Sequence, residues 1–125
     1  MKTAFVGLGV MGFPMAGYLA AHGHEVVVYN RSPDKAERWL EQNQGSSAAT
    51  PAEAADGADI VFCCVGNDDD VREVTLGEFG AVHVMSAGAI LVDHTTASAT
   101  LARELHTVAG ERQVGFLDAP LSGGQ

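Results

Sequence analysis

Short apolar runs alternate with segments of helical periodicity along the whole chain. The runs are rich in β-branched residues and too short for helices, so they predict buried strands over residues 3–6, 25–29, 60–64, 89–93 and 114–119. Helical spacing and helix-start signals predict helices over residues 11–22, 33–42, 51–57, 68–76 and 98–108. The segment 45–49 consists mainly of small residues at the place where a further strand is needed, and we expect it to be an edge strand.

Local signals mark where several of these helices begin. Ser32 and Pro33 supply a helix N-cap and a proline at the first helical position. Thr50 and Glu53 have the spacing of a capping box, in which each satisfies a free backbone N–H group of the first turn. Strands therefore alternate with helices throughout, without a linker or charge block, which predicts an α/β fold with one parallel sheet covered on both faces.

Composition narrows the possible functions. The chain of 125 residues has 7 Lys and Arg against 16 Asp and Glu, a formal net charge of −9. This charge disfavours binding to nucleic acid or to an anionic membrane surface. Glycine is in excess, because 15 of the 125 residues, or 12%, are glycine, whereas about 7% is usual. We therefore expect positions where the backbone must approach a neighbour closely.

No metal site is expected from the pattern of possible ligands. The two cysteines, Cys63 and Cys64, are adjacent in an apolar run and have no metal-ligand spacing, so buried reduced thiols are expected. The five histidines are dispersed along the chain. The consecutive carboxylates at 68–70 point in different directions on a helix and suit its N-terminus better than a metal ion.

The uncharged segment 3–21 raises the alternative of a signal peptide or a membrane-spanning helix. It contains Pro14 and several glycines, each of which destabilises a continuous helix. A short strand, a glycine turn and a helix fit this segment better. We therefore predict no membrane association and a cytoplasmic location.

The segment Gly7-Leu8-Gly9-Val10-Met11-Gly12 has the Gly-x-Gly-x-x-Gly pattern between the first predicted strand and the first helix. In this setting Gly7 permits the tight turn, Gly9 lets a pyrophosphate approach the backbone, and Gly12 lets the helix pack on the sheet. The free N–H groups of the helix then face the anion. The alternative is a purely structural glycine turn. The pattern predicts a Rossmann-type, doubly wound sheet of about six strands that binds a dinucleotide along residues 1–125.

The end of the second strand indicates which dinucleotide binds. An NAD site places Asp or Glu there to hold the ribose hydroxyls, whereas this chain has Asn30, Arg31 and Ser32, followed by Lys35 one helical turn later. Arginine offers a fork of donors to a 2′-phosphate, and lysine offers a point charge. These residues favour NADP(H) over NAD(H), unless Arg31 is an ordinary surface residue.

Together with the glycine pattern, four further motifs resemble the β-hydroxyacid dehydrogenase family, which includes 3-hydroxyisobutyrate dehydrogenases, semialdehyde reductases and, more distantly, 6-phosphogluconate dehydrogenase and the imine reductases. They are Gly23-His24, Asn30-Arg31-Ser32, Asp93-His94-Thr95-Thr96 and the segment Asp118-Ala119-Pro120-Leu121-Ser122-Gly123-Gly124. The resemblance covers the whole chain. It implies an oxidoreductase that interconverts a small β-hydroxyacid and its aldehyde acid by hydride transfer.

The resemblance also assigns roles to individual positions. Cys64 and Val65 match residues that pass along the cofactor's ribose and pyrophosphate, and Thr96 matches a threonine beside the nicotinamide ribose. Ser122, Gly123 and Gly124 match the family's Ser-Gly-Gly that binds the substrate carboxylate. Members of the family are expected to be homo-oligomers. For each of these positions, ordinary loop geometry is the alternative.

Two departures from the family affect the expected function. Ala99 stands where the family has proline, a small change. The family's catalytic lysine lies on a helix beyond the Ser-Gly-Gly motif, in a helical substrate and dimerisation domain outside these residues. Lys2 and Lys35 are expected at the wrong edge of the sheet and at the adenosine end, and His94 is expected to be a loop residue pointing away. These residues alone are therefore expected to bind cofactor without turnover, and a non-catalytic dinucleotide-binding module, a truncated fragment or an imine reductase-like domain remains the alternative.

Overall fold

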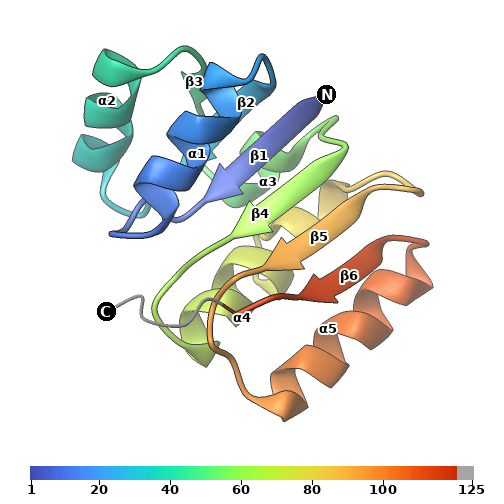
Figure 1. Cartoon of the computed structure of the whole chain (residues 1–125). Coiled ribbons are helices and arrows are strands. Elements are labelled where there is room, and N and C mark those ends of the chain that lie inside the picture. Colours follow the sequence, from blue (N-terminus) through green and yellow to red (C-terminus); the bar gives the residue numbers. More distant parts are fainter. Residues whose placement is uncertain (121–125) are drawn as a thin grey trace.

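A single parallel sheet forms the centre of the molecule. The computed structural model describes residues 1–120 and contains six strands in the order β3-β2-β1-β4-β5-β6. The strands are β1 (Lys2–Val6), β2 (Glu25–Tyr29), β3 (Ser46–Ser47), β4 (Ile60–Cys63), β5 (Ile90–Asp93) and β6 (Gly115–Asp118). The strand order reverses direction at β1, which lies between β2 and β4 (Figure 1). This is the order of a doubly wound Rossmann-type sheet, so the predicted fold is confirmed.

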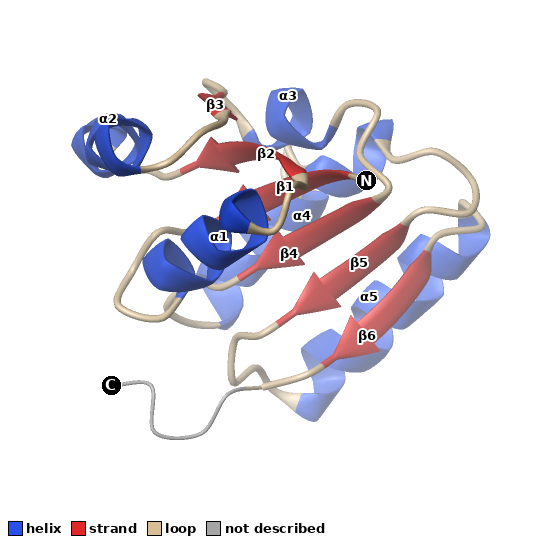
Figure 2. Ribbon diagram, turned by 45° about the horizontal axis from the view of Figure 1, so that its top comes forward, coloured by secondary structure: helices blue, strands red, loops and turns tan. Residues whose placement is uncertain are grey.

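Helices cover both faces of this sheet. They are α1 (Gly12–Ala21), α2 (Pro33–Gln42), α3 (Pro51–Ala55), α4 (Asp68–Leu76) and α5 (Ala99–Glu111), with a short 3-10 helix η1 (Ala81–Val84). Helices α1 and α2 lie on one face of the sheet, and α3, α4 and α5 lie on the other (Figure 2). The strand and turn before α1 exclude a continuous apolar helix over 3–21. No helix within residues 1–120 is long and apolar enough to span a bilayer.

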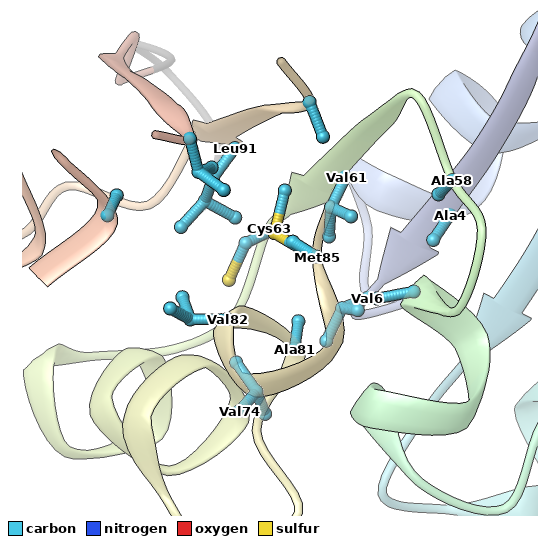
Figure 3. Close-up of a cluster of buried hydrophobic side chains, with 14 of the residues drawn as sticks. Ala4, Val6, Ala58, Val61, Cys63, Val74, Ala81, Val82, Met85 and Leu91 are labelled. Atoms are coloured by element: carbon cyan, nitrogen blue, oxygen red, sulfur yellow. The ribbon is translucent and has the colours of Figure 1, made fainter. Parts of the chain in front are cut away.

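The alternation of side chains along the central strands divides the core into two clusters. The larger cluster fills the face under α3, α4 and α5 and contains Val6, Val61, Cys63, Val82 and Met85 (Figure 3). Burial raises the pKa of the Cys63 thiol, as do the neighbouring Asp93 and Cys64. The predicted reduced, buried thiol is therefore correct for Cys63, whereas Cys64 is half-buried at the sheet edge.

The smaller cluster lies under α1 and α2. It contains Phe5 and Leu8 from the first strand and its turn, Val26 and Val28 from β2, and Trp39 from α2. The Trp39 side chain is completely buried, and its indole N–H has no hydrogen-bond partner among the described residues. The cluster fixes α2 against β2.

Three of the predicted helix starts are stabilised by side chains. Thr50, Asn67 and Ser98 accept hydrogen bonds from the backbone N–H groups of the first turns of α3, α4 and α5. The N-cap prediction at Ser32 is only half correct. Helix α2 does begin after Ser32, but the Ser32 hydroxyl makes no capping hydrogen bond.

Candidate functional site

An open cleft of about 480 Å³ lies where the loops after β1, β2 and β4 meet. Its volume falls in the range of small-molecule sites, about 300–1,000 Å³. Ten of the predicted site residues line it: Gly7, Gly9, Val10, Met11, Asn30, Arg31, Ser32, Lys35, Cys64 and Val65. Segments that are far apart in the sequence therefore form one site at the carboxyl edge of the sheet.

Three predicted residues in the described part of the chain lie outside the cleft lining. Leu8 and Gly12 are buried in the packing beneath it. Thr96 is exposed in the loop after β5. The predicted substrate residues Ser122, Gly123 and Gly124 lie outside the described residues.

The glycine loop has three glycines with different surroundings. Gly7 has a φ of +103°, and a Cβ there would overlap the carbonyl oxygen of Cys64. A Cβ at Gly12 would overlap the carbonyl oxygen of Gly7. At Gly9 nothing lies within 4 Å of an added Cβ. Gly7 and Gly12 therefore serve packing, whereas Gly9 faces open space in the cleft.

The N-terminus of α1 has free donors beside this loop. Met11 occupies the N-cap position and makes no side-chain capping hydrogen bond, and the first turn contains no acidic residue. Helices α3, α4 and α5, in contrast, have side-chain caps, whereas α2, like α1, has none. Free N–H groups and the helix dipole favour an anion at such an end. The start of α1 thus suits a phosphate in the cleft.

Asn30 holds the glycine loop to the end of β2. Its Oδ1 accepts a hydrogen bond from the backbone N–H of Leu8 at 2.9 Å, and its Nδ2 donates to the carbonyl oxygen of Ser32 at 3.1 Å. The Gly7 N–H also donates to the Tyr29 carbonyl oxygen at 2.9 Å. Asn30 therefore shapes the cleft by fixing the backbone of both loops.

A carboxylate that the sequence pattern did not indicate lies beside Arg31. Nη2 of Arg31 donates to Oδ1 of Asp70, in the first turn of α4, at 2.8 Å. Asp70, Glu73, Val74 and Gly66 all line the cleft. The cleft therefore contains acidic groups, although no carboxylate lies at the end of β2. Because α4 follows β4, and β4 pairs with β1, the strand order is the signal that could have placed Asp70 there.

A buried polar network supports the loop after β4. The Val65 N–H donates to Oγ1 of Thr95 at 3.0 Å, and the Thr95 N–H donates to Oδ1 of Asp93 at 2.9 Å. Oδ2 of Asp93 is buried and has no hydrogen-bond partner among residues 1–120. Burial raises the pKa of the Asp93 carboxyl above its ordinary value, against hydrogen bonds from Thr95 that lower it.

The Asp93 carboxyl makes stability depend on pH. Because its folded-state pKa is raised, its contribution to the free energy of unfolding is most favourable below the unfolded pKa of about 3.9 and declines as the pH rises through the folded pKa. Asp93→Asn keeps the acceptor for Thr95 and removes this titration. As the pH rises from about 4 to neutrality, the free energy of unfolding is therefore expected to decline less in the variant than in the unsubstituted protein. Urea unfolding followed by circular dichroism measures this difference. Equal declines in both proteins would contradict this role, and Glu37→Gln, an exposed change of the same kind, is the control.

His94 is packed at the sheet edge rather than pointing away in a loop. Its Nδ1 donates to the carbonyl oxygen of Ala119 at 2.8 Å, and its ring stacks on Phe62 with centroids 5.9 Å apart. His94 does not line the cleft. Because a carbonyl only accepts, Nδ1 carries the proton, and in the neutral ring Nε2 is left as an acceptor.

The two lysines lie as the sequence predicts. Lys2 begins β1 at the amino edge of the sheet, opposite the cleft, with Nζ 4.0 Å from Oε2 of Glu25. Lys35 lines the cleft in the first turn of α2, on the side of β2. Among the residues that the structure describes, no group of three or more His, Cys, Asp or Glu side chains is arranged to hold a metal ion.

Sheet order, glycine loop and uncapped helix together define a dinucleotide-binding domain of Rossmann type. The family pattern described as the NAD binding domain of 6-phosphogluconate dehydrogenase matches residues 2–125. The chain belongs to this NAD-binding domain family of 6-phosphogluconate and 3-hydroxyisobutyrate dehydrogenases, and the resemblance seen in the sequence is confirmed.

Individual relatives extend well beyond the matched region. The chain is 64% identical over 124 residues to an "Uncharacterized oxidoreductase" of Shewanella frigidimarina, covering 99% of this chain and 43% of the relative. It is 37% identical over 123 residues to the Arabidopsis thaliana protein named "Probable 3-hydroxyisobutyrate dehydrogenase-like 2, mitochondrial", covering 98% and 41%. The chain thus spans about two fifths of the length of these relatives.

Solved structures show the same fold. The 3-hydroxyisobutyrate dehydrogenase of Mycobacterium tuberculosis, determined with L-serine, superposes with a TM-score of 0.86 at 32% identity, over 98% of this chain and 41% of that one. Psf3, determined with NADP+ and 2-OPP, superposes with a TM-score of 0.88 at 27% identity, over 97% and 43%. The chain is therefore an NAD(P)-binding domain of the β-hydroxyacid dehydrogenase type.

Proposed function

We propose that the cleft binds NADP(H) with its pyrophosphate on the glycine loop. The observation that carries this proposal is the uncapped N-terminus of α1 beside Gly9, where the backbone is open to the cleft. Gly9, Val10 and Met11, which lead into α1, all line the cleft there. The fit of an anion to these free N–H groups supports the assignment.

The remaining cofactor contacts follow the edge of the sheet. Cys64 and Val65 line the cleft after β4 and would pass along the ribose and pyrophosphate. Thr96, in the loop after β5, would lie beside the nicotinamide ribose. When bound, the nicotinamide supplies the hydride. The described residues orient it, because the Asp93–Thr95–Val65 network fixes the loops on which these contacts depend.

NADPH is expected to bind more tightly than NADH because of Arg31. A charge-assisted hydrogen bond to the 2′-phosphate contributes about 1.5–3 kcal/mol, so Arg31→Ala should weaken NADPH binding roughly tenfold to a hundredfold and change NADH binding little. Isothermal titration calorimetry with both nucleotides measures the difference. Arg38→Ala removes the same charge from an exposed position of α2 outside the cleft and is the matched control. Equal losses for both nucleotides would show that Arg31 does not bind the phosphate.

The proposed reaction is hydride transfer between the cofactor and a small acid bearing an aldehyde or β-hydroxyl group. The printed names of the relatives, 3-hydroxyisobutyrate dehydrogenase among them, support this substrate class. Ser122, Gly123 and Gly124 would bind the substrate carboxylate, and residues 1–125 would form one cofactor domain beside a helical domain found in the family. The homo-oligomeric state and the cytoplasmic location stay predictions, and the Arabidopsis relative is named mitochondrial.

A polypeptide of these 125 residues is expected to bind NADPH yet to reduce glyoxylate or succinic semialdehyde at no more than a trace rate. The alkoxide formed by hydride transfer needs a positioned acid, which typically contributes about 10²–10⁴-fold. Lys2 lies at the opposite edge of the sheet, and Lys35 lies on the β2 side. NADPH oxidation followed by absorbance tests this expectation. Robust turnover that is lost in His94→Ala would overturn it and make His94 the acid, while binding without turnover fits a cofactor module.

A further inference from the structure

The Arg31–Asp70 ion pair crosses the cofactor cleft. Arg31 follows β2 and Asp70 belongs to α4, which follows β4, and β1 lies between these two strands in the sheet. The pair therefore joins the two sides of the cleft across the end of β1, where the glycine loop begins. Both residues line the cleft, so the contact lies within the space assigned to the dinucleotide.

The two partners of this pair are held very differently. The Asp70 side chain is 20% exposed, and its backbone N–H donates to Oδ1 of the N-cap residue Asn67 at 2.9 Å. The Arg31 side chain is 74% exposed and extends from a loop. Asp70 is thus the fixed partner and Arg31 the adjustable one. A guanidinium drawn toward a phosphate would have to leave this carboxylate or share its donors with it.

The charges around the cleft are balanced rather than basic. Arg31 and Lys35 supply positive charge, and Asp70 and Glu73 supply negative charge. A 2′-phosphate entering here meets a guanidinium already bound to an anion at 2.8 Å. The 2′-hydroxyl of NADH is neutral and does not compete for that guanidinium. The Asp70 carboxylate therefore opposes the binding of NADPH but not the binding of NADH.

We propose that Asp70 is a specificity-determining residue that competes with the 2′-phosphate for Arg31 and so limits the preference for NADPH over NADH. This inference rests on the proposed dinucleotide function of the cleft. The competition gives a carboxylate on α4 the discriminating role that an acidic residue at the end of β2 plays in an NAD site. It predicts that the ratio of the Kd values for NADPH and NADH changes when Asp70 loses its charge.

The test is Asp70→Asn, with Kd values for NADPH and NADH measured by calorimetry. Exposed ion pairs are worth up to about 1 kcal/mol, and the lost repulsion adds to this, so NADPH affinity should rise about threefold to tenfold while NADH affinity changes less than about twofold. Asp69→Asn is the matched control. It removes the same charge from the same first turn of α4, but Asp69 lies outside the cleft lining and is 97% exposed. Asp69→Asn should leave the ratio of the Kd values for NADPH and NADH unchanged.

Repeating Asp70→Asn in the Arg31→Ala variant separates competition for Arg31 from simple repulsion between Asp70 and the 2′-phosphate. In the Arg31→Ala variant, the gain in NADPH affinity from Asp70→Asn should shrink, because no guanidinium remains to be released. An equal gain in both backgrounds would overturn the proposal, and so would weaker NADPH binding or no change in Asp70→Asn. If the unsubstituted protein bound neither dinucleotide, the proposed function itself would fail, whereas Arg31-dependent NADPH binding with an unchanged ratio in Asp70→Asn would refute only the role of Asp70.

Discussion

Dinucleotide binding is expected to be lost in Gly9→Val while the fold stays intact. An added Cβ at Gly9 has no neighbour within 4 Å, and Gly9 is not among the glycines with positive φ. The fold therefore tolerates a side chain there. The isopropyl group would nevertheless occupy the space where a pyrophosphate meets the backbone. Calorimetric titration with NADPH and NADH, together with a urea unfolding curve, separates the two effects.

Gly110→Val provides the comparison for this experiment. Gly110 lies in α5, far along the chain from the glycine loop, and an added Cβ there also has open space. The substitution should leave dinucleotide affinity unchanged. Unchanged affinity in Gly9→Val as well would refute the placement of the pyrophosphate on this loop.

Gly12→Ala is expected to damage the fold itself. Its Cβ would overlap the carbonyl oxygen of Gly7 and approach Cε1 of Phe5 to 3.1 Å. Overpacking of this kind typically costs about 1–3 kcal/mol, and here backbone rather than a flexible side chain must move. Because the same shift displaces the glycine loop, dinucleotide affinity should fall together with stability. Urea midpoints and calorimetry measure the two losses.

The same glycine-to-alanine substitution at Gly110 is expected to have the opposite effect on stability. Alanine is favoured over glycine inside a helix by about 0.5–1 kcal/mol, and nothing obstructs its methyl group at Gly110. Gly110→Ala should therefore raise the urea midpoint. A Gly12→Ala protein with an unchanged midpoint would show that α1 can move away from the glycine loop without loss.

The elements that the sequence predicted well are those whose local pattern has one structural solution. The run 25–29 is β-branched and too short for a helix, and it forms β2 with the same bounds. The glycine pattern at 7–12 follows a strand and opens a helix, so its place at the carboxyl edge of the sheet was predictable. Eight of the ten cleft residues could be named from the glycine pattern and from the end of the second strand, and the other two, Cys64 and Val65, were named from the family resemblance.

The features that the sequence did not predict depend on contacts between distant segments. The 3-10 helix η1 is four residues long, and such a short apolar segment has no periodicity to detect. The edge strand predicted over 45–49 is present as β3, but its shortening to Ser46 and Ser47 was not predicted, because its pairing with β2 relies on backbone hydrogen bonds rather than on side-chain pattern. The contact of Asp70 with Arg31 joins residues 39 positions apart and needs the strand order.

The buried position of Trp39 gives this protein a built-in optical reporter. It is the single tryptophan of the chain, and its ring lies completely buried beneath α2, the helix that begins after Arg31 and Ser32. All indole emission therefore comes from the half of the sheet proposed to hold the adenosine end of the cofactor. A red shift in this emission reports exposure of that cluster, whereas quenching by a reduced nicotinamide, which absorbs where indole emits, reports occupancy of the cleft. Loosening of α2 and filling of the cleft can thus be followed in one unlabelled sample.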